Sequence, residues 1–95
     1  MFDPSYPSRM PEARDDASID LLEARGLYCP VPVLRTRDRL KKLSPGSRLD
    51  VLADDPLARL DMQSFCAREG HAYLGDRAEH GGGWRMSLRK APRML

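Results

Sequence analysis

One cysteine, set between a strand-like segment and a pair of prolines, is the residue of this chain best suited to chemistry. Cys29 lies in the run GLYCPVPVL, residues 26–34. Helices tolerate proline only in their first turn, so Pro30 predicts the first helical position and makes Cys29 the N-cap. The unpaired amide groups and the dipole at a helix start favour thiolate over thiol, and the thiolate is the reactive form. The sequence therefore predicts a nucleophile at a helix start.

The residues after the cysteine are expected to support an anion there. Four residues form the predicted first turn: Pro30, Val31, Pro32 and Val33. The two valines supply N–H groups that can stabilise a thiolate or a persulfide, while the prolines stiffen the turn so that the sulfur is presented to solvent. Arg35 follows one turn later and could add positive potential, although a solvated arginine is the default interpretation. The alternative is a buried N-capping cysteine without chemistry, because thiols are often buried.

The second cysteine and the two histidines carry weaker signals. Cys66 lies late in a predicted helix beside Phe65, and its position favours core packing over a resolving disulfide with Cys29, since a disulfide needs α-carbons within roughly 7 Å. His71 and His80 are isolated in the sequence from other residues that could bind a metal together with Cys29. A metal site needs several convergent groups, so none is predicted.

Two adjacent carboxylates form the next candidate pair. Asp54 and Asp55 precede Pro56, and this order predicts that Asp55 is the N-cap of a second helix. If the first two strands are parallel, both helices begin at the same edge of the sheet. Asp54 and Asp55 are then expected near Cys29, where they would help to shape a docking site for a partner.

Length and composition bound the remaining possibilities. The 95 residues suit one small domain, with 41% hydrophobic and 32% charged residues and a net charge of +2. Two cysteines are too few for a disulfide-stapled secreted fold, and no stretch resembles a signal peptide or a transmembrane span. A cytoplasmic protein is expected.

The periodicity of the chain predicts the elements that position these residues. Breakers and apolar spacing divide the domain into β-α-β-α-β-β, and the predicted elements are strands 19–24, 48–53, 71–74 and 84–89 and helices 30–43 and 56–69. Ile19 and Leu21 are expected to point inward, with Leu22 as a further candidate. In the second helix, Leu57, Leu60 and Phe65 follow one another at helical spacing. Short connections then give an α/β (α+β) two-layer sandwich, a four-stranded mixed sheet with both helices on one face. Residues 1–17 are predicted to be a flexible extension, 18–90 the domain and 91–95 a tail.

Several of these residues together resemble the TusA/SirA-like sulfur-carrier family, from about residue 19 to residue 90. The resemblance rests on the following matches: Gly26-Leu27, the Cys-Pro-x-Pro motif at 29–32, Pro45-Gly46, Ala53-Asp54-Asp55-Pro56, Asp61, Phe65 and Cys66. It implies the same two-layer fold and a persulfide on Cys29. It also implies a sulfurtransferase without metal or organic cofactor, which takes sulfane sulfur from a cysteine desulfurase or another persulfide donor. The acceptor would be a second protein, in tRNA thiolation, sulfur oxidation or cofactor assembly.

A basic stripe on the first helix leaves a second hypothesis open. Five basic residues lie within eight positions: Arg35, Arg37, Arg39, Lys41 and Lys42. They predict a docking surface for acidic patches of donor and acceptor, centred on Arg35 and Arg39 with Asp54 and Asp55. The alternative is a non-enzymatic RNA-binding or regulatory module. No aromatic residues accompany the stripe, so direct nucleic-acid binding is disfavoured, and a monomer that presents one face to successive partners is expected.

Overall fold

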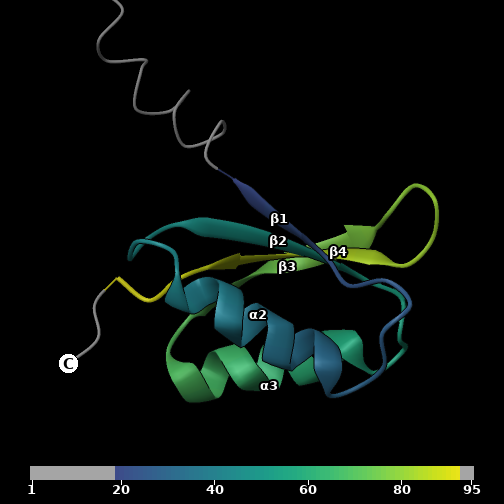
Figure 1. The fold of residues 1–95 in the computed structure, drawn as a ribbon, viewed down its shortest axis with the longest axis horizontal. Helices are drawn as coiled ribbons and strands as arrows, with labels where there is room; N and C mark the ends of the chain where they lie inside the picture. The colour runs from purple at the N-terminus through teal and green to yellow at the C-terminus, as the bar shows by residue number, and fades with distance from the viewer. Residues whose placement is uncertain (1–18, 93–95) are drawn as a thin grey trace, which may run out of the picture.

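The predicted order of strands and helices is present in the structure. The computed structural model describes residues 19–92, and the predicted extension 1–17 and most of the predicted tail lie outside this range. The six elements are β1 (Asp20–Glu23), α2 (Val31–Lys41), β2 (Arg48–Ala53), α3 (Ala58–Glu69), β3 (Ala72–Ala78) and β4 (Trp84–Arg89) (Figure 1). Ala91 is buried, and its N–H donates to Nδ1 of His71 at 2.9 Å, so the packed chain continues one residue past Lys90.

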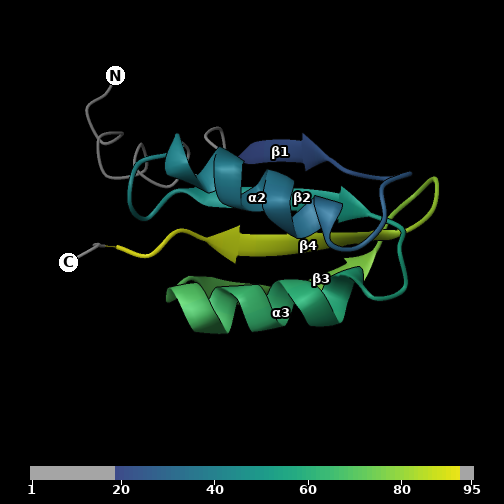
Figure 2. The ribbon, with the colours of Figure 1, turned by 60° about the horizontal axis from the view of Figure 1, so that its bottom comes forward.

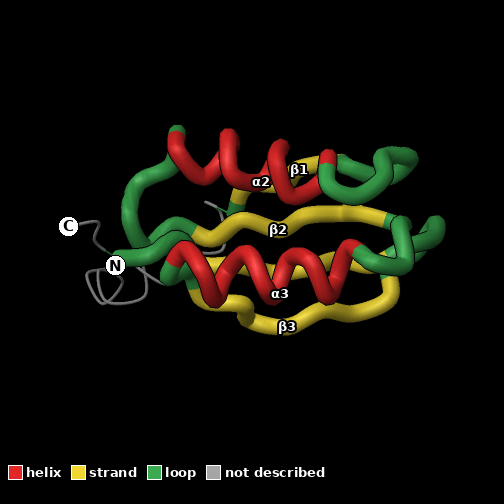
Figure 3. Tube along the Cα trace, turned by 90° about the horizontal axis from the view of Figure 1, so that it is seen from below, coloured by secondary structure: helices red, strands yellow, loops and turns green. Residues whose placement is uncertain are grey.

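The four strands form one mixed sheet in the order β1-β2-β4-β3. β1 and β2 are parallel, with Leu22 opposite Val51, whereas β4 runs antiparallel to both β2 and β3. Both helices cover the same face of the sheet, α2 over β1 and β2 and α3 over β4 and β3 (Figures 2 and 3). This arrangement confirms the predicted two-layer α+β sandwich. Among residues 19–92, neither helix has the length and apolar composition needed to cross a membrane.

The core lies between the helices and the sheet. Its largest fully buried side chains include Phe65, Leu40, Leu49, Met62 and Met86. In β1 the inward residue is Leu22, while Leu21 is 46% exposed, so the predicted inward orientation of Leu21 is wrong. Neighbouring residues of a strand point to opposite faces, and only one of the two leucines can therefore enter the core.

The second helix buries Phe65 as its spacing predicted, but not Leu57 or Leu60. Its buried residues are Ala58, Met62, Phe65 and Cys66, whereas Leu57 and Leu60 are 55% and 64% exposed. Apolar residues occur on all sides of this helix, so their spacing does not show which face is buried. β3 is longer than its predicted range 71–74, because a register irregularity between Tyr73 and Gly75 lets the strand continue to Ala78.

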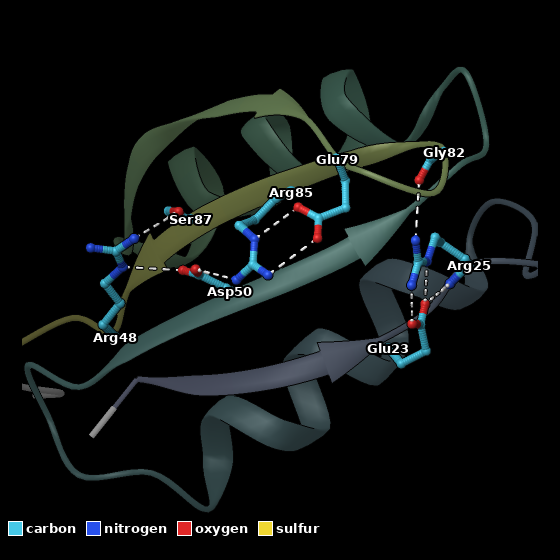
Figure 4. A network of polar contacts seen from close by, with 8 residues as sticks. All are labelled: Glu23, Arg25, Arg48, Asp50, Glu79, Gly82, Arg85 and Ser87. Carbon is cyan, nitrogen blue, oxygen red and sulfur yellow. Dashed lines mark hydrogen bonds and ion pairs between the residues drawn. The ribbon is translucent and has the colours of Figure 1, made fainter. Parts of the chain in front are cut away.

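The helix-free face of the sheet carries a network of charged residues. Asp50 of β2 is 2% exposed and accepts hydrogen bonds from Nε of Arg48 at 3.1 Å and from Nη1 of Arg85 at 3.0 Å. Arg85 also donates to Glu79, and Arg48 donates to the hydroxyl of Ser87 (Figure 4). The central strand thus buries a carboxylate that two guanidinium groups neutralise.

The glycine-rich turn between β3 and β4 closes against the end of β2. A Cβ on Gly83 would lie 2.5 Å from the carbonyl oxygen of Ala53 and 3.0 Å from Cβ of Asp54. Gly83 also has a φ of +81°, which residues with a side chain rarely adopt. This close approach holds the Ala53–Asp54 segment, and Asp54 in turn accepts the N–H of Gly26 at 2.9 Å.

The substitution Gly83→Ala is therefore expected to destabilise the domain. The backbone conformation alone costs about 1–2 kcal/mol, and the clash with Ala53 adds to this cost. Gly82→Ala is the matched control, because Gly82 has a φ of +109° but no atom within 4 Å of its Cβ position. Urea denaturation of the two variants measures the difference, and equal midpoints would show that the close approach is not tight.

Candidate functional site

The site lies at the sheet edge where both helices begin. The chain leaves β1 and β2 there, and the segments before α2 and α3 come together (Figure 2). Cys29 is exposed, immediately before the N-cap of α2. Its backbone N–H donates to Oδ2 of Asp55 at 2.6 Å, which ties the cysteine loop to the entrance of α3. The thiol is therefore open to solvent while its backbone is fixed.

The start of α2 differs from its prediction by one residue. The helix begins at Val31 with Pro30 as N-cap, so Cys29 precedes the cap rather than forming it. Pro30 has no side chain that could cap, and Pro32 is buried in the first turn. The N–H of Val31 donates to the carbonyl oxygen of Tyr28 at 2.8 Å and is therefore not available to the sulfur. The role predicted for the amide of Val33 stays a prediction.

The thiol faces a carboxylate instead. Sγ of Cys29 donates a hydrogen bond to Oδ2 of Asp61, in the first turn of α3. This hydrogen bond raises the pKa of the Cys29 thiol, and partial desolvation and the charges of Asp61 and Asp55 act in the same direction. Both acidic neighbours favour the protonated thiol, which is opposite to the direction expected from the helix start.

Asp61 is a site residue for which no role was predicted from the sequence. It is 32 positions from Cys29, and only the packing of α2 beside α3 brings the two together. The sequence position of Asp61 could have indicated this proximity, because Asp61 follows the predicted start of the second helix by about one turn. That helix start was expected at the same edge of the sheet as Cys29.

Asp54 and Asp55 lie where the sequence placed them, at the edge that carries Cys29. Asp55 does not cap α3, whose N-cap is Leu57, but its Oδ1 accepts the N–H of Leu57 at 3.0 Å in the preceding turn. The hydrogen bonds from the backbone of Cys29 and then of Leu57 lower the pKa of Asp55. Asp55 is buried and holds two loops together, whereas Asp54 is exposed.

The basic residues of α2 do not form a continuous free surface. Arg39 pairs with Asp20 of β1 at 2.7 Å. Four of the five residues of the stripe are exposed: Arg35, Arg37, Lys41 and Lys42. The structure gives no contact between Arg35 and the thiol, so its predicted effect on Cys29 stays a prediction.

Cys66 is a core residue. It is 2% exposed within the main hydrophobic cluster, and burial raises the pKa of its thiol to about 11. His71 stacks near Phe65 with ring centroids 5.5 Å apart, consistent with a structural role. Within the described range 19–92, no group of three or more His, Cys, Asp or Glu residues is arranged to hold a metal ion.

The fold and the exposed cysteine define a class of small two-layer α+β proteins with a free cysteine in the loop before the first helix. A SirA-like protein from Desulfitobacterium hafniense has the same fold, with a TM-score of 0.67 and 24% identity over 77% of this chain and 97% of that one. The sequence from residue 21 to residue 90 matches the family described as "Sulfurtransferase TusA".

Two relatives agree with this match. The "Sulfur carrier protein TusA" of Pseudomonas savastanoi pv. phaseolicola is 38% identical over 73 residues, which cover 76% of this chain and 87% of the relative. The protein of the same description from Pseudomonas aeruginosa is 40% identical over 65 residues, 67% of this chain and 82% of the relative. The chain belongs to the TusA sulfurtransferase family.

Proposed function

We propose that this chain is a sulfur carrier that accepts a sulfane sulfur as a persulfide on Cys29 and passes it to an acceptor protein. The observation that carries the proposal is an exposed thiol at the opening of α2, in a chain of the TusA family. The curated relatives are named sulfur carriers, which supports the same role. The buried Cys66 would take no part.

The proposed reaction follows thiol–disulfide exchange. The sulfur of Cys29 attacks the outer sulfur of the donor's cysteine persulfide, and the bond between the donor's two sulfurs breaks with its electron pair on the donor cysteine. An acceptor thiol later attacks the outer sulfur of the Cys29 persulfide in the same way. Neither step changes the overall oxidation level or needs a metal or an organic cofactor. The donor we propose is a cysteine desulfurase, in the cytoplasm.

Exposed apolar side chains near the thiol support docking of protein partners there. Tyr28, next to Cys29, is 75% exposed, and Leu57 and Leu60 at the start of α3 are 55% and 64% exposed. Large apolar groups are enriched in the buried centres of protein interfaces. Of the four residues predicted to dock partners, Arg35 and Asp54 remain exposed, while Arg39 and Asp55 are engaged within the domain.

A loading assay tests this function. The protein is incubated with a cysteine desulfurase and cysteine, and its intact mass is measured without reductant. We expect wild type and Cys66→Ala to gain the mass of one sulfur atom, and Cys29→Ser to gain none. Loading of Cys29→Ser at the wild-type level would contradict the proposal.

A further inference from the structure

The carboxylate of Asp61 is placed to act on the sulfur itself. It accepts a hydrogen bond from Sγ of Cys29, whereas Asp55 binds the backbone N–H of the same residue. The two carboxylates therefore have separate tasks: Asp55 fixes the loop, and Asp61 contacts the reacting atom. Asp61 is partly buried in the first turn of α3, so its position does not depend on a flexible loop.

The unloaded cysteine keeps its proton in this environment. Both charged groups that act on the thiol, Asp61 of α3 and Asp55 of the preceding turn, are acidic, and they raise the pKa of Cys29. A thiol with a raised pKa is both a weaker nucleophile at neutral pH and a poorer leaving group, because thiolates with a low pKa leave faster. A carrier must nevertheless perform both roles, first when it is loaded and later when it is unloaded.

Sulfur exchange at Cys29 also requires the transfer of a proton between two sulfur atoms. A persulfide is more acidic than the corresponding thiol, so the donor arrives as an anion, R–S–S⁻. In the reaction Cys29–SH + R–S–S⁻ → Cys29–S–S⁻ + R–SH, the thiol proton moves to the donor sulfur that receives the electron pair of the broken S–S bond. Without that transfer a thiolate would attack an anion and expel a second thiolate. A group that moves one proton between the two sulfurs removes this obstacle.

We propose that Asp61 is a catalytic residue of sulfur transfer, which takes the proton from Sγ of Cys29 during attack and delivers it to the departing sulfur of the donor. This inference rests on the proposed carrier function. Unloading is the reverse: Asp61 takes the proton of the acceptor thiol and returns it to Sγ of Cys29 as the outer sulfur leaves. In each direction one S–S bond forms, one breaks, and one proton crosses the site through the carboxylate.

The test compares sulfur exchange in Asp61→Asn with that in wild type. Glutathione persulfide is the probe, because it donates sulfur without a docking surface, and intact mass reports the rate of uptake at neutral pH. Since general acid–base groups contribute about 10²–10⁴-fold, we expect uptake to fall roughly 100-fold. Asp61→Glu, which keeps the carboxylate, is expected to recover part of this rate. Asp38→Asn on the exposed side of α2 makes the same charge change and is the control.

The pH dependence of Cys29 alkylation by iodoacetamide distinguishes a catalytic role of Asp61 from a purely structural one. This reaction needs no proton delivered to its leaving group, and loss of the carboxylate lowers the pKa of Cys29. We therefore expect the midpoint of the alkylation profile to move to lower pH in Asp61→Asn, while sulfur uptake falls. Uptake at or above the wild-type rate, or an unmoved midpoint, would overturn the role of Asp61. If wild type itself takes up no sulfur on Cys29, the carrier function fails instead.

Discussion

Replacing Asp50 with alanine is expected to lower the free energy of unfolding by about 3 kcal/mol, roughly a 100-fold change in the unfolding equilibrium. Asp50 is 2% exposed and holds both Arg48 and Arg85. Its removal leaves two guanidinium groups on the central strands without this anion. The expected loss lies at the lower end for a buried ion pair, because Arg85 keeps Glu79 and both arginines reach solvent. Urea denaturation measures it.

The pH dependence of this effect has a defined sign. Burial opposes ionisation of Asp50, but the hydrogen bonds from Arg48, Arg85 and Ser87 prevail and lower its pKa. A lowered folded-state pKa gives stability that is present above the ordinary carboxyl value of about 3.9 and is lost as the pH falls below it. The difference between wild type and Asp50→Ala is therefore expected to shrink in acid.

A partly exposed ion pair provides the control for the Asp50 network. Asp20→Ala breaks the pair with Arg39, in which the two side chains are 35% and 34% exposed. Such pairs contribute less than about 1 kcal/mol. If Asp20→Ala and Asp50→Ala destabilise the protein equally, burial of the Asp50 carboxylate is not the reason for its importance.

The two cysteines are expected to differ in alkylation rate by roughly three orders of magnitude or more. Cys29 is exposed, whereas Cys66 is 2% exposed with a pKa raised to about 11 by burial. Iodoacetamide can reach Cys66 only when the domain opens, and a stably folded domain outnumbers its unfolded form by at least about 10³. Peptide mass spectrometry after a timed reaction measures both rates. In denaturing urea the two cysteines are expected to react alike.

The pH profile of Cys29 alkylation shows whether the helix start or the carboxylate of Asp61 dominates the pKa of the thiol. Because Asp61 raises the pKa of the thiol, the midpoint should lie above that of the same cysteine in an unstructured peptide. A midpoint below the peptide value would mean that the helix start dominates and that the carboxylate does not. The variant Cys66→Ala removes the second thiol and serves as the control.

The order of elements could be predicted because breakers separate them clearly. Pro45-Gly46 follows the first helix, which ends at Lys41 rather than at the predicted residue 43, and Gly70 adopts the left-handed conformation that closes α3. In β4, Met86 and Leu88 lie at alternate positions, and both are buried. Those local signals, with the preference for short connections, were enough to give the two-layer arrangement.

Positions that depend on packing could not be predicted in the same way. Leu57 and Leu60 lie at helical spacing with Phe65, yet α3 buries Phe65 and leaves both leucines exposed. Periodicity fixes the spacing of a stripe but does not choose between two overlapping ones. The strands that pack against α3 decide which of its faces is buried, and these contacts cannot be read from the sequence.

The chemistry at the thiol was predicted in part. The spacing around Cys29 indicated the exposed position before a helix, and the parallel strands indicated that Asp55 lies nearby. The contact with Asp61 reverses the expected direction of the thiol pKa. A local pattern cannot show this, because the carboxylate comes from the second helix.

Peptide mapping of the transferred sulfur shows whether Cys29 carries it. After loading by a cysteine desulfurase with ³⁵S-cysteine, thiols and persulfides are trapped by alkylation and the protein is digested with trypsin. Cleavage after arginine places Cys29 in peptide 26–35 and Cys66 in peptide 60–68. We predict that the label appears in peptide 26–35 and is released by dithiothreitol. Label confined to peptide 60–68, or label that resists reduction, would contradict the account.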